Sequence, residues 1–91
     1  MAVLRLVSGP ASRNTYDRVV AAMKLHTEHP LGLILHGANL VDGEIQVTQV
    51  WDSAEYALRF EEEILGPVLA AHGVSAAREV KVVELCDLVT P

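Results

Sequence analysis

The sequence predicts a single α+β domain, residues 1–91, with a four-stranded antiparallel sheet that carries two helices on one face. Short β-branched runs and runs of helical period follow one another in the order β-α-β-β-α-β. An Asp-Gly pair joins the two central strand-like runs as a tight hairpin. No repeat or low-complexity segment divides the chain. Together these observations predict the split βαβ, or ferredoxin-like, arrangement.

The first strand is predicted over Ala2 to Val7, where an apolar run meets Ser8-Gly9-Pro10. A helix is expected next, with Asn14 as its N-cap and Asp17 in its first turn. The helix is expected to end before Pro30, because the residue before a proline avoids the helical conformation. The apolar positions at helical spacing are Tyr16, Val19, Val20 and Met23, followed by His26 or Thr27.

The hairpin is predicted at Asp42-Gly43, because a type I′ turn needs positive φ at both central residues. Counting outward from this turn fixes which residues share a face of the sheet. The predicted pairs are Val41 with Glu44, Ala38 with Val47, His36 with Gln49, and Ile34 with Trp51. The predicted helix-side face carries Ile34, His36, Ala38, Leu40, Ile45, Val47, Gln49 and Trp51.

The second helix is predicted to begin at Asp52 or Ser53, both good capping residues. Gly66-Pro67 is expected to break or kink it, and Gly73 to end it. The run Glu61-Glu62-Glu63 is interpreted as its solvated side. Its inner stripe is predicted to be Tyr56, Phe60 and Ile64.

The final strand is predicted over Glu79 to Val89 and is apolar on both alternations from Val80 to Leu85. Two helices can cover only one face of the sheet, so an apolar face is left bare. A domain of 91 residues also has little core to spare. We therefore expect a homodimer formed through the face away from the helices.

Charge and composition exclude several classes of partner. The formal net charge is −5 and no Lys/Arg stripe is present, so we expect no nucleic-acid partner. No apolar run approaches the ~20 residues of a membrane span, and the N-terminus lacks the pattern of a signal peptide, which predicts a cytoplasmic protein with no membrane partner. Cys86 is the single cysteine, and His26 and His29 lack further ligands nearby, so no metal site is expected.

The chain resembles the antibiotic-biosynthesis-monooxygenase-like domains of the dimeric α/β-barrel superfamily. The resemblance covers nearly the whole chain and is carried by the element order and three stretches: "GLILHGA" from Gly32, "VTQVWDSAEYALRFEE" from Val47 and "EILGPVLAAHG" from Glu63. It implies the ferredoxin-like fold and a homodimer. The superfamily includes cofactor-free monooxygenases, haem-degrading enzymes, polyketide cyclases and muconolactone-isomerase-like enzymes, so the fold alone selects no reaction.

The haem-degrading branch fits poorly. Such relatives carry an Asn on the first strand, whereas this chain has Arg5 there. They carry a Trp on the second helix where this chain has Arg59-Phe60, and His72 matches their histidine only across a change in spacing. We therefore expect no cofactor.

His36 and Gln49 are the candidate catalytic residues, because an imidazole titrates near neutral pH and can take or give a proton. The predicted register sets the Gln49 amide across from the ring, where it can fix the tautomer. A histidine that is merely hydrogen-bonded in the core is the open alternative. The candidate substrate-binding residues are Trp51, Tyr16, Tyr56, Phe60 and Met23, each of which can instead be core packing.

The resemblance implies a cofactor-independent monooxygenase that oxidises a hydrophobic phenolic or polyketide-like aromatic, with His36 as the base. Arg5 or Arg59 can supply a positive group for a phenolate, or lie in solvent. A polyketide cyclase would use the same base and pocket without oxygen. A non-catalytic small-ligand-binding domain stays open as well, because no complete catalytic set is recognisable.

Overall fold

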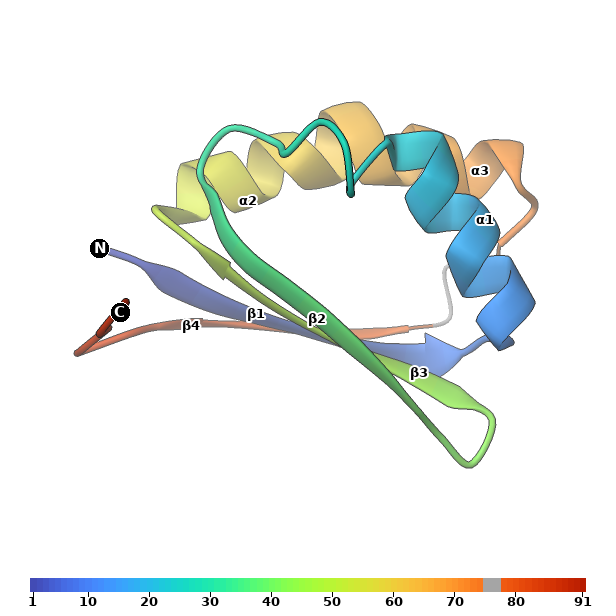
Figure 1. Cartoon of the computed structure of the whole chain (residues 1–91), viewed down its shortest axis with the longest axis horizontal. Helices are drawn as coiled ribbons and strands as arrows, with labels where there is room; N and C mark the ends of the chain where they lie inside the picture. The colour runs from blue at the N-terminus through green and yellow to red at the C-terminus, as the bar shows by residue number, and fades with distance from the viewer. Residues whose placement is uncertain (75–77) are drawn as a thin grey trace.

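The computed structural model describes residues 1–74 and 78–91 and has the predicted α+β architecture, a ferredoxin-like β-α-β-β-α-β domain with an antiparallel sheet of order β2-β3-β1-β4. The helices form one layer on one face of the sheet, and the other face is bare (Figure 1). The elements are β1 (Val3–Pro10), α1 (Arg13–Met23), β2 (Leu33–Val41), β3 (Glu44–Trp51), α2 (Ala54–Phe60), the π-helix η1 (Glu61–Leu65), α3 (Gly66–Ala71) and β4 (Glu79–Glu84).

The hairpin confirms the predicted turn and most of the predicted register. Asp42 and Gly43 both have positive φ, 49° and 79°. His36 pairs with Gln49, as predicted. The predicted pairing of Ile34 with Trp51 is wrong, because an irregularity between Leu33 and Leu35 shifts the register and sets Leu33 opposite Trp51. Leu33, not Ile34, therefore packs against the core.

The first helix begins and ends earlier than predicted. Its N-cap is Ser12, whose hydroxyl accepts a hydrogen bond from the Thr15 backbone N–H at 3.1 Å, so Asn14 lies inside the first turn. The helix ends at Met23, because Lys24 adopts a left-handed conformation with φ 56°. The turn after it carries Leu25 into the core, where this side chain is buried.

The second helix is capped by Ser53, as predicted. Gly66-Pro67, expected to break or kink this helix, does not end it, but a π-helix interrupts the regular α-helix just before the pair. Pro67 has no N–H, and a proline ring clashes with the carbonyl four residues back in a regular α-helix. The π-helix η1 widens the path before the proline, and the Gly66 N–H donates to the Glu61 carbonyl, five residues back. The helical path continues to Ala71, and Gly73 at φ 67° follows its end.

β4 is shorter than predicted because its partner begins at Val3. The pairing with β1 stops at Glu84 opposite Val3, and the Leu85 N–H makes one further bond to the Ala2 carbonyl at 2.9 Å. The first strand in turn extends past Val7, since its last residues pair with β3 up to Glu44.

The core lies between the sheet and the helices and is centred on Trp51, the one large side chain with no exposed surface among the described residues. Its ring lies 5.0 Å from that of Phe60. The other buried members of this cluster are Val3, Val19, Val20, Leu25, Ala57 and Leu65. Burial along β3 falls from Trp51 toward Glu44, so the core is densest at one end of the sheet.

The bare face of the sheet changes from apolar to polar along the strands. At the Trp51 end, one row crosses all four strands through Leu35, Val50, Leu4 and Val83. Toward the hairpin turn, the corresponding row is Asn39, Gln46, Ser8 and Glu79. The Asn39 amide donates to Gln46 Oε1 at 2.9 Å, across the pairing of β2 with β3. We call the first set the apolar row.

Candidate functional site

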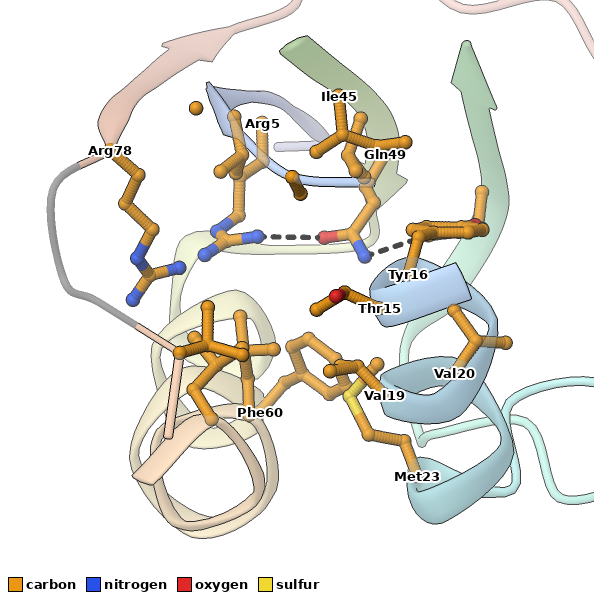
Figure 2. A pocket seen from close by; sticks show the side chains of 18 of the residues that line it. Arg5, Thr15, Tyr16, Val19, Val20, Met23, Ile45, Gln49, Phe60 and Arg78 are labelled. Atoms are coloured by element: carbon orange, nitrogen blue, oxygen red, sulfur yellow. Dashed lines mark hydrogen bonds between the residues drawn. The ribbon is translucent and has the colours of Figure 1, made fainter. Parts of the chain in front are cut away.

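A cavity of about 110 Å³ lies between the sheet and the helices, partly open to solvent. Its volume is of the same order as an engineered apolar cavity of about 150 Å³ that binds benzene, so one aromatic ring fits. The floor is formed by the side chains Arg5, Val7, His36, Ile45, Val47 and Gln49, and the roof by Tyr16, Val19, Met23, Phe60 and Leu65 among others. In Figure 2, Phe60, Val19 and Met23 face the strand residues across this space.

The Gln49 amide is fixed by two side chains that can only donate hydrogen bonds. Its oxygen accepts from Arg5 Nη1 at 3.1 Å and from the Trp51 indole N–H at 3.1 Å. A guanidinium and an indole carry no acceptor, so the atom that faces both must be the oxygen. The amide –NH₂ therefore points the other way and donates to His36 Nδ1 at 3.0 Å. Figure 2 shows the Arg5–Gln49 bond at the sheet side of the cavity.

The amide in turn fixes the tautomer of His36. Because Nδ1 accepts from Gln49, the proton of the neutral ring is on Nε2. Nε2 lies 2.7 Å from the Tyr16 hydroxyl oxygen, so Nε2–H donates to it. The two rings are nearly parallel, with an interplanar angle of 8°. Both ring nitrogens of His36 are thus engaged by neighbouring side chains.

Burial lowers the pKa of His36 below its ordinary value of 6.5, and His26 lowers it further through charge repulsion. The hydrogen bonds act in the same direction, because an imidazolium would direct an Nδ1–H at the –NH₂ group of Gln49. His36 is therefore neutral at pH 7. For Tyr16, burial raises the pKa of the hydroxyl above 10.0, so this group keeps its proton.

We call the hydrogen-bonded series Arg5, Gln49, His36 and Tyr16 the polar wall of the cavity. A buried charge cluster lies at its Arg5 end. Arg5 is 3% exposed and its Nη2 lies 3.3 Å from Glu61 Oε1. Glu61 also accepts a hydrogen bond from Arg78. Burial lowers the pKa of Arg5, and the Glu61 carboxylate opposes that change. Figure 2 shows the Arg78 side chain directed into the same space as Arg5.

Sequence reasoning missed part of this cluster. Glu61 was interpreted as solvated, yet its side chain is 27% exposed and pairs with two arginines. Arg78 had no predicted role. The sequence does indicate that Arg5 faces inward, because it alternates with Val3 and Val7 on the inner side of β1. Nothing in the sequence indicates the position of Glu61, because the π-helix that places it could not be foreseen.

The structure places the predicted site residues in two groups. Tyr16, Met23 and Phe60 line the cavity together with His36 and Gln49. Two other predicted residues do not line it. Trp51 lies within the core and reaches the site only through its bond to Gln49. Tyr56 packs over Gly32, where an added Cβ would come within 2.4 Å of the ring, and Arg59 lies on the same ring at 5.9 Å.

Two further findings concern the described residues as a whole. Within residues 1–74 and 78–91, no group of three or more His, Cys, Asp or Glu side chains is placed to hold a metal ion. In the same ranges, no helix is both long and apolar enough to cross a membrane.

Fold and site together define a class of protein: a ferredoxin-like domain with a small, mostly apolar cavity between helices and sheet. No family model and no curated protein matches the chain. Solved structures do match its fold. One named for antibiotic biosynthesis monooxygenase, from Chloroflexus aurantiacus, has a TM-score of 0.70 at 16% identity and covers 99% of this chain and 98% of its own.

Two other structures have the same fold. SnoaB, a cofactor-independent oxygenase from Streptomyces nogalater, has a TM-score of 0.68 at 12% identity, with 99% of this chain and 98% of its own covered. A protein of unknown function from Nitrosomonas europaea has a TM-score of 0.75 at 15% identity, with 99% and 94% covered. The chain thus has the fold of the antibiotic-biosynthesis-monooxygenase-like domains, which confirms the fold that the sequence resemblance implies.

Proposed function

We propose that the chain is a cofactor-independent monooxygenase that oxidises a phenolic or polyketide-like aromatic. The observation that carries the proposal is the composition of the cavity wall: an apolar space for one ring, bordered on a single side by hydrogen-bonded polar groups. Such a wall orients an aromatic ligand by hydrogen bonds to its oxygen, while the ring is in contact with apolar side chains and shielded from water. The fold shared with SnoaB, named a cofactor-independent oxygenase, adds support by analogy.

The reaction requires little from the protein. A phenol that loses its proton becomes electron-rich enough to reduce dioxygen itself. One oxygen atom becomes the new carbonyl of a quinone, the other leaves as water, and the four electrons come from the substrate. The protein has to favour the deprotonated substrate, orient it and exclude water.

Two features favour the deprotonated substrate. The first is charge: the two positive side chains Arg5 and Arg78 line the cavity and share the single negative partner Glu61, which leaves one net positive charge there. His36 stays the candidate base, and its lowered pKa keeps it in the proton-accepting form. In the arrangement described, however, Nδ1 already accepts from Gln49 and Nε2 carries the proton. His36 can therefore act as a base only if the Gln49 side chain first turns away.

Oxygen consumption tests the proposal. Purified protein, treated with a chelator, is given a panel of polyphenolic aromatics in an oxygen-electrode cell, and quinone formation is followed by absorbance. We expect uptake of one O₂ per quinone with at least one member of the panel. Loss of activity in His36→Ala but not in His29→Ala, an exposed histidine, would support a role of His36 in the reaction. Turnover without oxygen would instead indicate the polyketide cyclase alternative.

A non-catalytic small-ligand-binding domain is the second candidate, and one observation favours it. Both ring nitrogens of His36 are engaged by neighbouring side chains, so neither is free to act as a base in this arrangement. Binding of an aromatic that is recovered unchanged after long incubation, with affinity kept in His36→Ala, would decide for the binder.

A homodimer through the bare sheet face is part of the proposal, and the apolar row supports it. Leu35 and Val83 at the two ends of this row are 46% and 41% exposed, and Leu6 beside it is 37% exposed. A second copy related by a two-fold axis would cover a continuous apolar band on both chains. Sedimentation in dilute solution should give twice the chain mass, and Leu6→Asp should give the monomer mass. A monomeric wild-type protein would exclude the dimer.

A further inference from the structure

We propose that the Tyr16 hydroxyl, and not the His36 imidazole, contacts the oxygen of the bound aromatic, and that it donates a hydrogen bond there, so that the cavity holds the ligand as its oxyanion. His36 is then a positioning residue. The inference takes the class of ligand from the proposed function. The geometry from which it is argued does not depend on whether the protein turns over a substrate.

The hydrogen bonds of the polar wall all run in one direction. Arg5 and Trp51 donate to the Gln49 oxygen, the Gln49 amide donates to His36, and His36 donates to Tyr16. Since the first two groups have no lone pair to offer, the series cannot be reversed without leaving two buried donors unpaired. Its last proton is that of the Tyr16 hydroxyl, which has no acceptor among the described residues.

The position of Tyr16 makes this proton available to a ligand. The side chain lines the cavity and its oxygen is already engaged by His36 Nε2–H. A hydroxyl that accepts one hydrogen bond is a stronger donor of its own proton, because the bonds polarise one another. Besides burial, two charged groups act on the pKa of the Tyr16 hydroxyl in opposite directions: Asp17 raises it and Arg13 lowers it, and these two side chains pair with each other at 3.0 Å.

The same wall discriminates between the ionised and the neutral ligand. A neutral phenol would gain an ordinary hydrogen bond from Tyr16, whereas an oxyanion gains a charge-assisted one of about twice the strength. The ionised ligand is also attracted by Arg5 and Arg78, only one of which is offset by Glu61. Deprotonation is then favoured by binding, and no side chain has to remove the proton as a base.

The first test is the tautomer of His36 in the ligand-free protein. Nitrogen chemical shifts of isotope-labelled histidine distinguish Nε2–H from Nδ1–H. We expect His36 to be the Nε2–H tautomer, and to lose this preference in Gln49→Leu. An Nδ1–H tautomer in the wild-type protein would overturn the proposal, whatever the activity.

The second test measures the ionisation of a bound probe. The probe is para-nitrophenol, whose anion absorbs visible light, titrated with pH in the presence of excess protein. We expect the wild-type protein to lower the pKa of the bound probe. Tyr16→Phe should reduce the ratio of anion to neutral form by roughly 10- to 100-fold, the effect of one hydrogen bond to a charged group. His36→Phe should give a smaller loss.

The matched control is Tyr56→Phe, which removes a hydroxyl that does not line the cavity. Its bound probe should ionise as in the wild-type protein. The proposal is overturned if the wild-type protein does not bind the probe, or if Tyr16→Phe and Tyr56→Phe leave the same anion fraction. If the shift depends on Tyr16 but no phenol consumes oxygen, the oxygenase function fails while the present inference holds.

Discussion

The helix-covered face of the sheet has two halves with opposite properties. The packed half holds Val3 and Trp51 beneath Ala57 and Phe60, all of them buried. The open half, nearer the hairpin turn, holds Val7, Ile45 and Val47 beneath the cavity, and these side chains are only partly buried. The same two strands, β1 and β3, and the same alternation of side chains build both halves.

The boundary between the halves shows how one depends on the other. Gln49 lies on it, and receives a hydrogen bond from Trp51 in the packed half before it passes one to His36 at the cavity. The rigid half thus sets the orientation of a polar group in the half that can hold a ligand. A site built on a dry, close-packed neighbour is held more precisely than one built on loops.

The largest expected effect comes from the packed half. Trp51→Ala removes the most buried aromatic side chain of the described core and the indole N–H that fixes Gln49. We expect a loss of about 3–5 kcal/mol in the free energy of unfolding, the usual cost of a buried Trp-to-Ala change. Urea denaturation measures it. A loss below about 1 kcal/mol would show that the packed half does not carry the stability of the domain.

A smaller effect is expected at the boundary. Gln49→Leu keeps the approximate size but leaves the Trp51 indole N–H, His36 Nδ1 and Arg5 Nη1 without their shared partner, while Arg5 keeps its ion pair with Glu61. We expect a loss of about 3 kcal/mol, since each unpaired buried group costs about 1–3 kcal/mol and the cavity admits some water. Gln46→Leu, an exposed amide on the same strand, should change stability by less than about 0.5 kcal/mol. Equal losses in both variants would contradict the argument.

The third effect is a dependence of stability on pH. It arises in the cavity half of the sheet face, because His36 lies there. Its folded pKa lies below 6.5, so between the two values the unfolded chain binds more protons than the folded one. The stability that His36 contributes is complete above pH 6.5 and is lost as the pH falls through the folded pKa. Thermal unfolding from about pH 8 to about pH 5 should show this loss. It should shrink in Gln49→Leu, where no –NH₂ group opposes protonation of Nδ1.

Much of this contrast could be predicted from local sequence. The Asp42-Gly43 turn fixes the strand register by itself, so the pairing of His36 with Gln49 followed from counting residues. Capping by Ser53 was equally local. The irregularity at Ile34 could not be foreseen, because it depends on which side chain, Leu33 or Ile34, fits against the Trp51 core.

The site was harder to predict than the fold, for a physical reason. The roles of Arg5, Glu61 and Arg78 depend on contacts between β1, the π-helix and the residue just before β4, which are distant in sequence. Trp51 and Tyr56 have the residue type and spacing expected of a pocket, but tertiary packing places Trp51 within the core and Tyr56 over Gly32, away from the cavity. Spacing determines the face on which a side chain lies, and tertiary contacts determine whether it meets a ligand.

The smallest expected effect comes from adding one methyl group to each half. Val47→Ile extends a partly buried side chain into the cavity and keeps the branch at Cβ that suits a strand. We expect a change in the free energy of unfolding within about 0.5 kcal/mol, because the added group fills space that is already empty. Val3→Ile is the matched substitution in the packed half, where Val3 is 2% exposed, and overpacking there should cost about 1–3 kcal/mol. Binding of para-nitrophenol should respond in the reverse order, weakened by Val47→Ile and unchanged per folded molecule by Val3→Ile. Equal stability losses in the two variants would mean that the cavity is not open space in solution, and that the division of the sheet face into two halves does not hold.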